Sequence, residues 1–150
     1  MDEFRLSSER RGGYTVVAVR GNLDIVTRDQ FDNYLTGIRR EHDRIIIDMS
    51  AVGFMDTSSL AIVVGHWKKL SAAGGVLILA GARYRYAKTL WITGLAYRLP
   101  LYDSVEEAMA ADPPQPRGER NVTRAERPRR TRPPGRKGPA LPGKSDEPEQ

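Results

Sequence analysis

The middle of the chain reads Arg44-Ile45-Ile46-Ile47-Asp48-Met49-Ser50, then Ala51-Val52-Gly53-Phe54-Met55, then Asp56-Thr57-Ser58-Ser59-Leu60. Its three consecutive isoleucines do not alternate with polar residues, which predicts a strand covered on both faces, as in a parallel sheet. Beyond this strand, Asp56 or Thr57 can cap a helix, because their oxygens accept hydrogen bonds from the free N–H groups of the first turn. Such a helix start also favours a phosphate, and Ser58 lies there. We therefore expect a functional site at this strand-to-helix junction.

On both sides of this stretch, the sequence predicts an alternation of strands and helices. Residues 4–9 and 14–20 enclose Gly12-Gly13 and are expected to form an antiparallel hairpin. Helices are predicted over residues 27–41, 58–73, 84–92 and 105–111, and further strands over residues 45–49, 76–80 and 98–101. Because strands alternate with helices after the hairpin, we expect a mostly parallel sheet with right-handed crossovers.

The predicted helices carry apolar faces that indicate a core. These faces consist of Phe31, Leu35 and Ile38 in the first helix, and of Leu60, Val63, Val64, Trp67 and Leu70 in the second. His66 lies off the second face and is predicted to be a solvated helix residue. Trp91 is expected in the core, whereas Tyr84-Arg85-Tyr86 is expected to be partly exposed, a composition that is common in contact patches.

The composition changes sharply near Asp112. Nine of the ten prolines lie beyond this residue, among almost no large apolar side chains. Such a segment cannot bury enough surface to offset its ordering entropy, so we predict one domain over residues 1–111 and a disordered tail over residues 112–150. The tail holds ten basic and six acidic residues, which accounts for most of the net charge of +5. Its arginines could contact nucleic acid, but no aromatic residues interleave to stack on bases, and a passive solvated segment is favoured.

Several classes of site find no support in the sequence. The chain has no cysteine, which excludes disulfides, thiolate zinc sites and cysteine nucleophiles. Its two histidines, His42 and His66, do not suggest a metal site, and no cofactor is expected. No apolar run approaches the roughly 20 residues that span a bilayer, and the N-terminus lacks the apolar region of a signal peptide. The sequence therefore predicts a cytoplasmic protein without a membrane span.

Asp24 and Asp56 could be interpreted as a pair of acid–base carboxylates. No histidine, metal-ligand cluster or glycine-rich phosphate loop accompanies them, however. We therefore expect neither an enzyme nor a small-molecule substrate.

The chain resembles the STAS domain, and within that family it is similar to the bacterial anti-sigma factor antagonists. The resemblance rests on four motifs in the family's order: Gly21-Asn22-Leu23-Asp24, the run from Ile47 to Leu60, Thr93-Gly94-Leu95, and Ser104-Val105-Glu106-Glu107-Ala108. It implies an α/β fold, a single STAS domain whose mostly parallel central sheet carries an N-terminal antiparallel hairpin and about four helices. The order of elements predicted above agrees with that fold.

The resemblance also implies roles for individual residues. Ser58 matches the residue that is phosphorylated in the family, with Ser59 and Thr57 as alternatives. The partner-binding surface is matched by Asn22, Asp24, Asp56, Thr57 and Ser59. Asn22 stands where the family usually has glutamate, which bears on partner choice. Ser59 stands where it usually has glycine, so its side chain is expected to crowd an approaching kinase or to offer a competing hydroxyl.

The residues by themselves allow simpler roles at the same positions. Thr57, Ser58 and Ser59 could be no more than capping hydroxyls. Asp24 could be a turn residue beside a helix, and Asp48 a strand-end carboxylate that is bonded to backbone.

The function implied by the resemblance is that of an anti-sigma factor antagonist under phosphorylation control. The unphosphorylated form would bind an anti-sigma factor with a serine-kinase fold and so release a sigma factor. That partner would then phosphorylate Ser58 with ATP and break the complex, and a serine phosphatase would restore it. The alternative is a STAS-fold binding module of a stress-signalling or lipid-transport assembly without a phosphoswitch.

Overall fold

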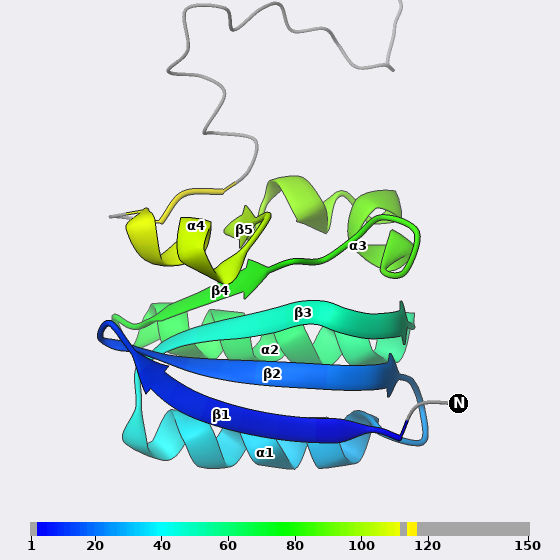
Figure 1. Ribbon diagram of the computed structural model, residues 1–150, viewed down its shortest axis with the longest axis horizontal. Helices are drawn as coiled ribbons and strands as arrows, with labels where there is room; N and C mark the ends of the chain where they lie inside the picture. The colour runs from blue at the N-terminus through cyan, green and yellow to red at the C-terminus, as the bar shows by residue number, and fades with distance from the viewer. Residues whose placement is uncertain (1–2, 112–113, 117–150) are drawn as a thin grey trace, which may run out of the picture. The chain divides into compact units, whose positions relative to one another are not determined.

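One five-stranded sheet organises the fold, with its strands in the order β1-β2-β3-β4-β5. The computed structural model describes residues 3–111 and 114–116, so the predicted tail lies almost wholly outside the described residues. The strands are β1 (Arg5–Arg11), β2 (Tyr14–Leu23), β3 (Arg44–Met55), β4 (Val76–Ala80) and β5 (Leu101–Tyr102). The helices are α1 (Arg28–Glu41), α2 (Thr57–Ala72), α3 (Lys88–Ile92) and α4 (Val105–Ala110), with a 3₁₀ turn over Leu95–Tyr97. β1 pairs antiparallel with β2 and all other pairs are parallel (Figure 1), which confirms the predicted sheet.

The N-terminal hairpin turns at Gly12 and Gly13. Both residues have positive φ, 56° and 86°, the left-handed conformation that a two-residue hairpin turn requires and that glycine adopts without steric strain. The strands pair from Arg11 and Tyr14 outward to Arg5 and Arg20. The hairpin predicted from the two glycines is therefore confirmed, with strands slightly longer than expected.

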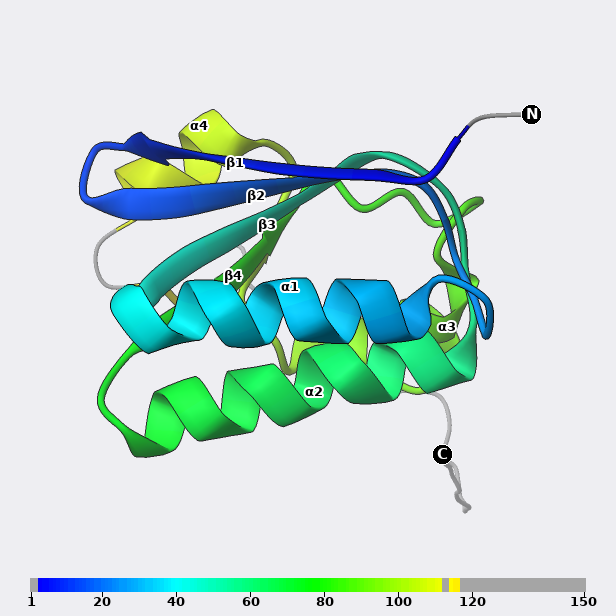
Figure 2. The same ribbon diagram turned by 90° about the horizontal axis from the view of Figure 1, so that it is seen from below.

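The isoleucine run of β3 is buried from both sides, as the absence of alternation predicted. Ile45, Ile46 and Ile47 are all 0% exposed. Ile45 and Ile47 belong to the larger core, together with residues of α1 and α2, whereas Ile46 packs in a second cluster with residues of β5 and α4. Figure 2 shows α1 and α2 side by side on one face of the sheet and α4 on the other.

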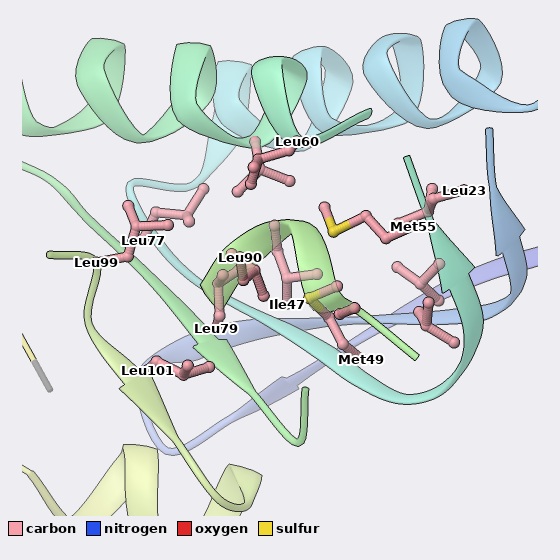
Figure 3. Close-up of a cluster of buried hydrophobic side chains, with 14 of the residues drawn as sticks. Leu23, Ile47, Met49, Met55, Leu60, Leu77, Leu79, Leu90, Leu99 and Leu101 are labelled. Atoms are coloured by element: carbon pink, nitrogen blue, oxygen red, sulfur yellow. The ribbon is translucent and has the colours of Figure 1, made fainter. Parts of the chain in front are cut away.

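The larger core lies on the face of the sheet that α2 covers, and both strands and helices contribute side chains to it (Figure 3). The labelled residues that meet there are Leu23, Ile47, Met49, Met55, Leu60, Leu77, Leu79, Leu90, Leu99 and Leu101. Leu60 comes from the first turn of α2 and Met55 from the end of β3, so the segment between them is held by core packing on both sides. This anchoring fixes the strand-to-helix junction in place.

β3 is longer than predicted, because β2 continues beside it. The predicted strand ended at Met49, but β3 runs to Met55. Its second half pairs with the end of β2, from Arg20 opposite Ala51 to Leu23 opposite Met55, with one register shift just before Arg20 and a second between Gly21 and Asn22. The stretch Ser50-Ala51-Val52-Gly53, with its serine, alanine and glycine, does not predict a strand, so the extension depends on the neighbouring strand.

Two other predicted elements differ from the structure. The helix predicted over residues 84–92 begins only at Lys88. Ala87, the N-cap of α3, is buried, and its backbone angles, φ −139° and ψ 47°, are not helical. The strand predicted over residues 98–101 is β5, which starts only at Leu101, because the 3₁₀ turn that ends at Tyr97 is followed by a turn over residues 98 and 99. The Pro100 carbonyl accepts the first bond between the strands, from Leu79 N–H at 2.9 Å. The left-handed Gly94, φ 82°, lies beyond the end of α3 as predicted.

His66 is buried, so its predicted solvation is wrong. Its side chain lies between α1 and α2, where Nε2 is 2.7 Å from Asp32 Oδ1 and Arg39 Nε donates to Nδ1 at 2.9 Å. Because Nδ1 accepts this bond, Nε2 carries the proton and the ring is neutral. Burial lowers the pKa of His66 most, and the Arg39 and Lys69 charges lower it further, against the opposing effect of Asp32. The apolar pattern of α2 could not show this, because both partners come from α1.

The lowered pKa of His66 makes the stability of the fold depend on pH. Below about pH 6.5 the unfolded histidine takes up a proton that the folded one excludes, so the free energy of unfolding should fall as the pH is lowered. The slope from this residue should not exceed about 1.4 kcal/mol per pH unit. Urea denaturation between pH 7.5 and pH 5, with His66→Gln as the control, measures it. An equal slope in the two proteins would contradict the assignment.

Candidate functional site

The parallel strands β2 and β3 are neighbours, and their carboxyl ends lie side by side at the same end of the sheet. Asn22 is opposite Phe54 and Leu23 is opposite Met55. The Asp56 N–H donates to the Leu23 carbonyl at 2.9 Å, which ties the two chain segments together as they leave the sheet. The two predicted polar segments therefore lie next to each other: Asn22–Asp24, which leads into α1, and Asp56–Ser59, which opens α2.

Asp56 is the N-cap of α2. Its Oδ1 accepts from the Ser59 N–H at 2.8 Å and from the Ser58 hydroxyl at 2.9 Å. Its extended backbone, φ −96° and ψ 175°, is usual for a capping residue. Of the two residues predicted to be able to cap, the structure selects Asp56.

The hydrogen bonds of Asp56 also set its charge. Burial raises the pKa of its carboxyl, but the bonds from Ser59 and Ser58, helped by the nearby Arg28 charge, outweigh this effect, and the net pKa lies below the ordinary value. Asp56 is therefore ionised at neutral pH. The Ser58 hydroxyl points at a fixed negative charge.

The three hydroxyls of the helix start differ in exposure. Thr57 is exposed, Ser58 is half-buried, and Ser59 is 0% exposed. The first turn of α2 directs the Ser59 side chain into the core, away from the surface where it was expected to crowd a kinase or to offer a competing hydroxyl. The Ser59 hydroxyl has no hydrogen bond of good geometry among the described residues, although it is near enough to Asp56 to help lower its pKa.

Asp24 organises the turn between β2 and α1. Its Oδ1 accepts from the N–H groups of Val26 at 3.0 Å and Thr27 at 3.2 Å, while its own N–H donates to Thr27 Oγ1 at 3.1 Å. Asp48 has a similar local role, accepting from the N–H and the hydroxyl of Ser50. Both carboxylates thus have the simple backbone-binding role that the sequence allowed. For Asp24, this role also fixes the loop that leaves the site.

Sequence reasoning missed the apolar side chains that surround this site. Ile25 is 67% exposed, Val26 83% and Phe54 50%. Ile25 and Val26 lie in the β2–α1 turn and Phe54 is the strand partner of Asn22. An apolar pair between Asp24 and Thr27, before the helix begins, was the available signal. The exposure of Phe54 could not be predicted without the extension of β3.

Within residues 3–111 and 114–116, no three His, Asp or Glu side chains gather closely enough to hold a metal ion. None of the helices in this described part has the length and apolar character needed to cross a bilayer. Asp24 and Asp56 both accept hydrogen bonds from backbone N–H groups, which is capping geometry.

The cap can be separated from the charge at Asp56. Asp56→Ala should lower the free energy of unfolding by about 1 kcal/mol, because the Ser59 N–H loses its acceptor. Asp56→Asn should restore most of that loss, since asparagine is also a good N-cap. Urea denaturation of the three proteins tests this. Equal free energies of unfolding for wild type and Asp56→Ala would contradict the role of Asp56 as the N-cap of α2.

Comparison with known proteins identifies the class to which this fold and site belong. Residues 5–108 match the family model of the STAS domain, so the chain belongs to the STAS domain family. The anti-sigma F factor antagonist of Paenibacillus polymyxa is 27% identical over 110 residues, covering 71% of this chain and 92% of that one. The anti-sigma-B factor antagonist of Staphylococcus aureus is 32% identical over 80 residues, covering 53% and 74%. Within the STAS family, the chain therefore falls among the anti-sigma factor antagonists, as its motifs predicted.

Solved structures share the fold. An anti-sigma factor antagonist from Mycobacterium paratuberculosis matches with a TM-score of 0.64 and 24% identity, over 70% of this chain and 90% of that one. The Bacillus cell fate determinant SpoIIAA, in its phosphorylated form, matches with a TM-score of 0.54 and 24% identity, over 71% and 96%.

Proposed function

We propose that this protein binds an anti-sigma factor of the serine-kinase type while Ser58 is unphosphorylated, and so releases a sigma factor. Phosphorylation of Ser58 by that partner, with ATP as the donor, breaks the complex, and a serine phosphatase restores it. The protein acts in the cytoplasm as a binding partner and not as an enzyme. The names of its relatives support the partner class, and the existence of a phosphorylated form of SpoIIAA supports the mode of control.

One observation carries the proposal: Ser58 lies half-buried in the first turn of α2, with its hydroxyl 2.9 Å from the Asp56 carboxylate. The neighbouring Ser59 is fully buried and Thr57 has no hydrogen bond to that carboxylate among the described residues. A kinase approaching this turn therefore finds Ser58 held by a hydrogen bond to Asp56, and the Ser59 hydroxyl out of reach.

The exposed side chains around Ser58 supply a surface for the partner. Ile25, Val26 and Phe54 are apolar and solvated, and they flank the polar residues Asn22 and Asp24. Apolar anchors surrounded by polar groups are typical of protein interfaces. We infer that the partner covers these side chains in the complex.

A phosphate on Ser58 has opposite effects on the fold and on the complex. It adds about −1.5 to −2 charges, and it removes the proton with which Ser58 bonds to Asp56. The helix N-terminus favours the added charge by about 0.3–1 kcal/mol, so the domain should stay folded. In a closed interface, repulsion from Asp56 and loss of phosphate hydration act together. A penalty of about 3–4 kcal/mol would weaken binding by two to three powers of ten.

Transcription in vitro tests the proposed function. RNA polymerase, the sigma factor and its anti-sigma factor should be inactive together on a promoter for that sigma factor, and adding this protein should restore transcript. Protein that has first been phosphorylated should restore little. The alternative, a STAS-fold binding module without a phosphoswitch, would be favoured by a different result. In that case the unphosphorylated protein would not restore transcript and would bind a stress-signalling or lipid-transport assembly instead.

A further inference from the structure

A hollow of about 330 Å³ lies beside the start of α2. One wall is formed by the end of β3 and the helix start, the other by the segment that leads into α3. The lining residues are Phe54, Met55, Asp56 and Thr57 on the first wall, and Arg85, Tyr86, Lys88 and Thr89 on the second. The Thr89 hydroxyl donates to the Met55 carbonyl at 3.4 Å and joins the two walls. Ser58 itself does not line this hollow, but Asp56, which accepts the hydrogen bond of the Ser58 hydroxyl, and the adjacent Thr57 both do. We call it the basic hollow, after Arg85 and Lys88 in its lining.

The basic hollow carries two cations without acidic partners. Arg85 and Lys88 are exposed, and neither forms an ion pair in the part of the chain that the structure describes. The Arg85 guanidinium lies 5.4 Å from the centre of the Tyr86 ring, and the Lys88 ammonium 6.0 Å from that of Tyr84. These cation–π contacts hold the charges near the rim without neutralising them.

Asp56, the one carboxylate among the lining residues of the basic hollow, is already hydrogen-bonded within α2. Asp56 accepts from the Ser59 N–H and from the Ser58 hydroxyl, as the cap of α2. Phe54, 50% exposed, adds an apolar surface on the same wall. The hollow therefore offers two free cations next to an exposed aromatic ring, which complements an acidic side chain with an apolar neighbour.

We propose that the basic hollow docks an acidic segment of the anti-sigma factor, with a carboxylate between Arg85 and Lys88 and an apolar side chain against Phe54. This inference rests on the proposed function, because it names a contact that the same partner makes. It extends the binding surface from the Asp24 loop across the start of α2 to the segment before α3. It also gives a role to Tyr84-Arg85-Tyr86, the exposed aromatic and arginine cluster noted in the sequence.

Charge reversal tests the docking contact. Arg85→Glu/Lys88→Glu should bind the purified cognate anti-sigma factor about tenfold more weakly by titration calorimetry, and its affinity should depend less on salt. Lys68→Glu/Arg98→Glu is the matched control, since it changes the net charge equally at two exposed residues outside the hollow. That control should bind within about twofold of wild type. Thermal melting checks the fold of both, and Arg85→Gln/Lys88→Gln replaces the reversed pair if that pair melts early.

The outcomes separate this inference from the function on which it rests. If wild type does not bind the anti-sigma factor, the proposed function fails, and the docking contact with it. If wild type binds and the Arg85/Lys88 variants bind equally well, the contact is wrong and the function stands. An equal loss in the Lys68/Arg98 control would show general attraction between the two proteins and would also overturn the contact. Restored binding to Arg85→Glu/Lys88→Glu, when an acidic residue of the partner is changed to lysine, would support it directly.

Discussion

Ser58→Ala should stay bound to the anti-sigma factor in the presence of ATP and magnesium, under conditions that release the wild-type protein. The alanine cannot accept the phosphate that places a second negative charge beside Asp56. Size-exclusion chromatography before and after incubation with ATP measures release, and mass spectrometry should find one phosphate on wild type, at Ser58. The expected difference in affinity between the two ATP-treated proteins is two to three powers of ten, about 3–4 kcal/mol.

The fold should tolerate this substitution. Ser58→Ala removes one hydrogen bond to Asp56, but the Ser59 N–H still donates to the same carboxylate. Thr57→Ala is the matched control for release, because it removes an exposed hydroxyl from the same turn but leaves Ser58, so ATP should still release it. Ser58→Asp should bind less well than wild type, though a carboxylate carries less charge than a phosphate. Identical release of Ser58→Ala and wild type would end the switching mechanism, and a phosphate mapped to Thr57 would move the site by one residue.

Ile25→Ser/Val26→Ser should bind the anti-sigma factor about 30- to 700-fold more weakly than wild type. Exposed apolar anchors that become fully covered in a complex contribute about 1–2 kcal/mol each, and each 1.4 kcal/mol is tenfold in affinity. Both side chains extend into solvent, 67% and 83% exposed, so they contribute little to the stability of the free domain. Titration calorimetry with the unphosphorylated proteins measures the change.

The stability of this double variant is its control. Its melting temperature should equal that of wild type, because Asp24 and Thr27 hold the loop through backbone and hydroxyl groups that the substitutions leave in place. Unchanged affinity with unchanged stability would place the partner elsewhere on the domain. In that case the polar residues Asn22 and Asp24 would also lose their proposed role.

The sequence was enough to predict those elements whose structure depends on a few neighbouring residues. The run Ile45–Ile47 predicted a strand buried on both faces, and Gly12-Gly13 predicted the hairpin turn, because each depends on the conformational or burial preferences of the residues themselves. The cap at Asp56 followed for the same reason, since its partner is only three residues away.

The features that sequence reasoning missed depend on contacts between distant segments. His66 is buried because Asp32 and Arg39 from α1 satisfy its ring nitrogens, and no pattern within α2 contains that information. β3 extends to Met55 because β2 runs beside it, and only this extension places Phe54 next to Asn22 at the site. The basic hollow likewise needs the segment before α3 to lie against the end of β3.

The dissociation constant of the complex with the cognate anti-sigma factor, measured by titration calorimetry for the same wild-type preparation before and after complete phosphorylation, tests the switch most directly. Phosphorylation at Ser58 should raise this constant by two to three powers of ten, while the melting temperature of the free domain changes little. Equal dissociation constants for the two forms, with one phosphate confirmed on Ser58, would contradict the account.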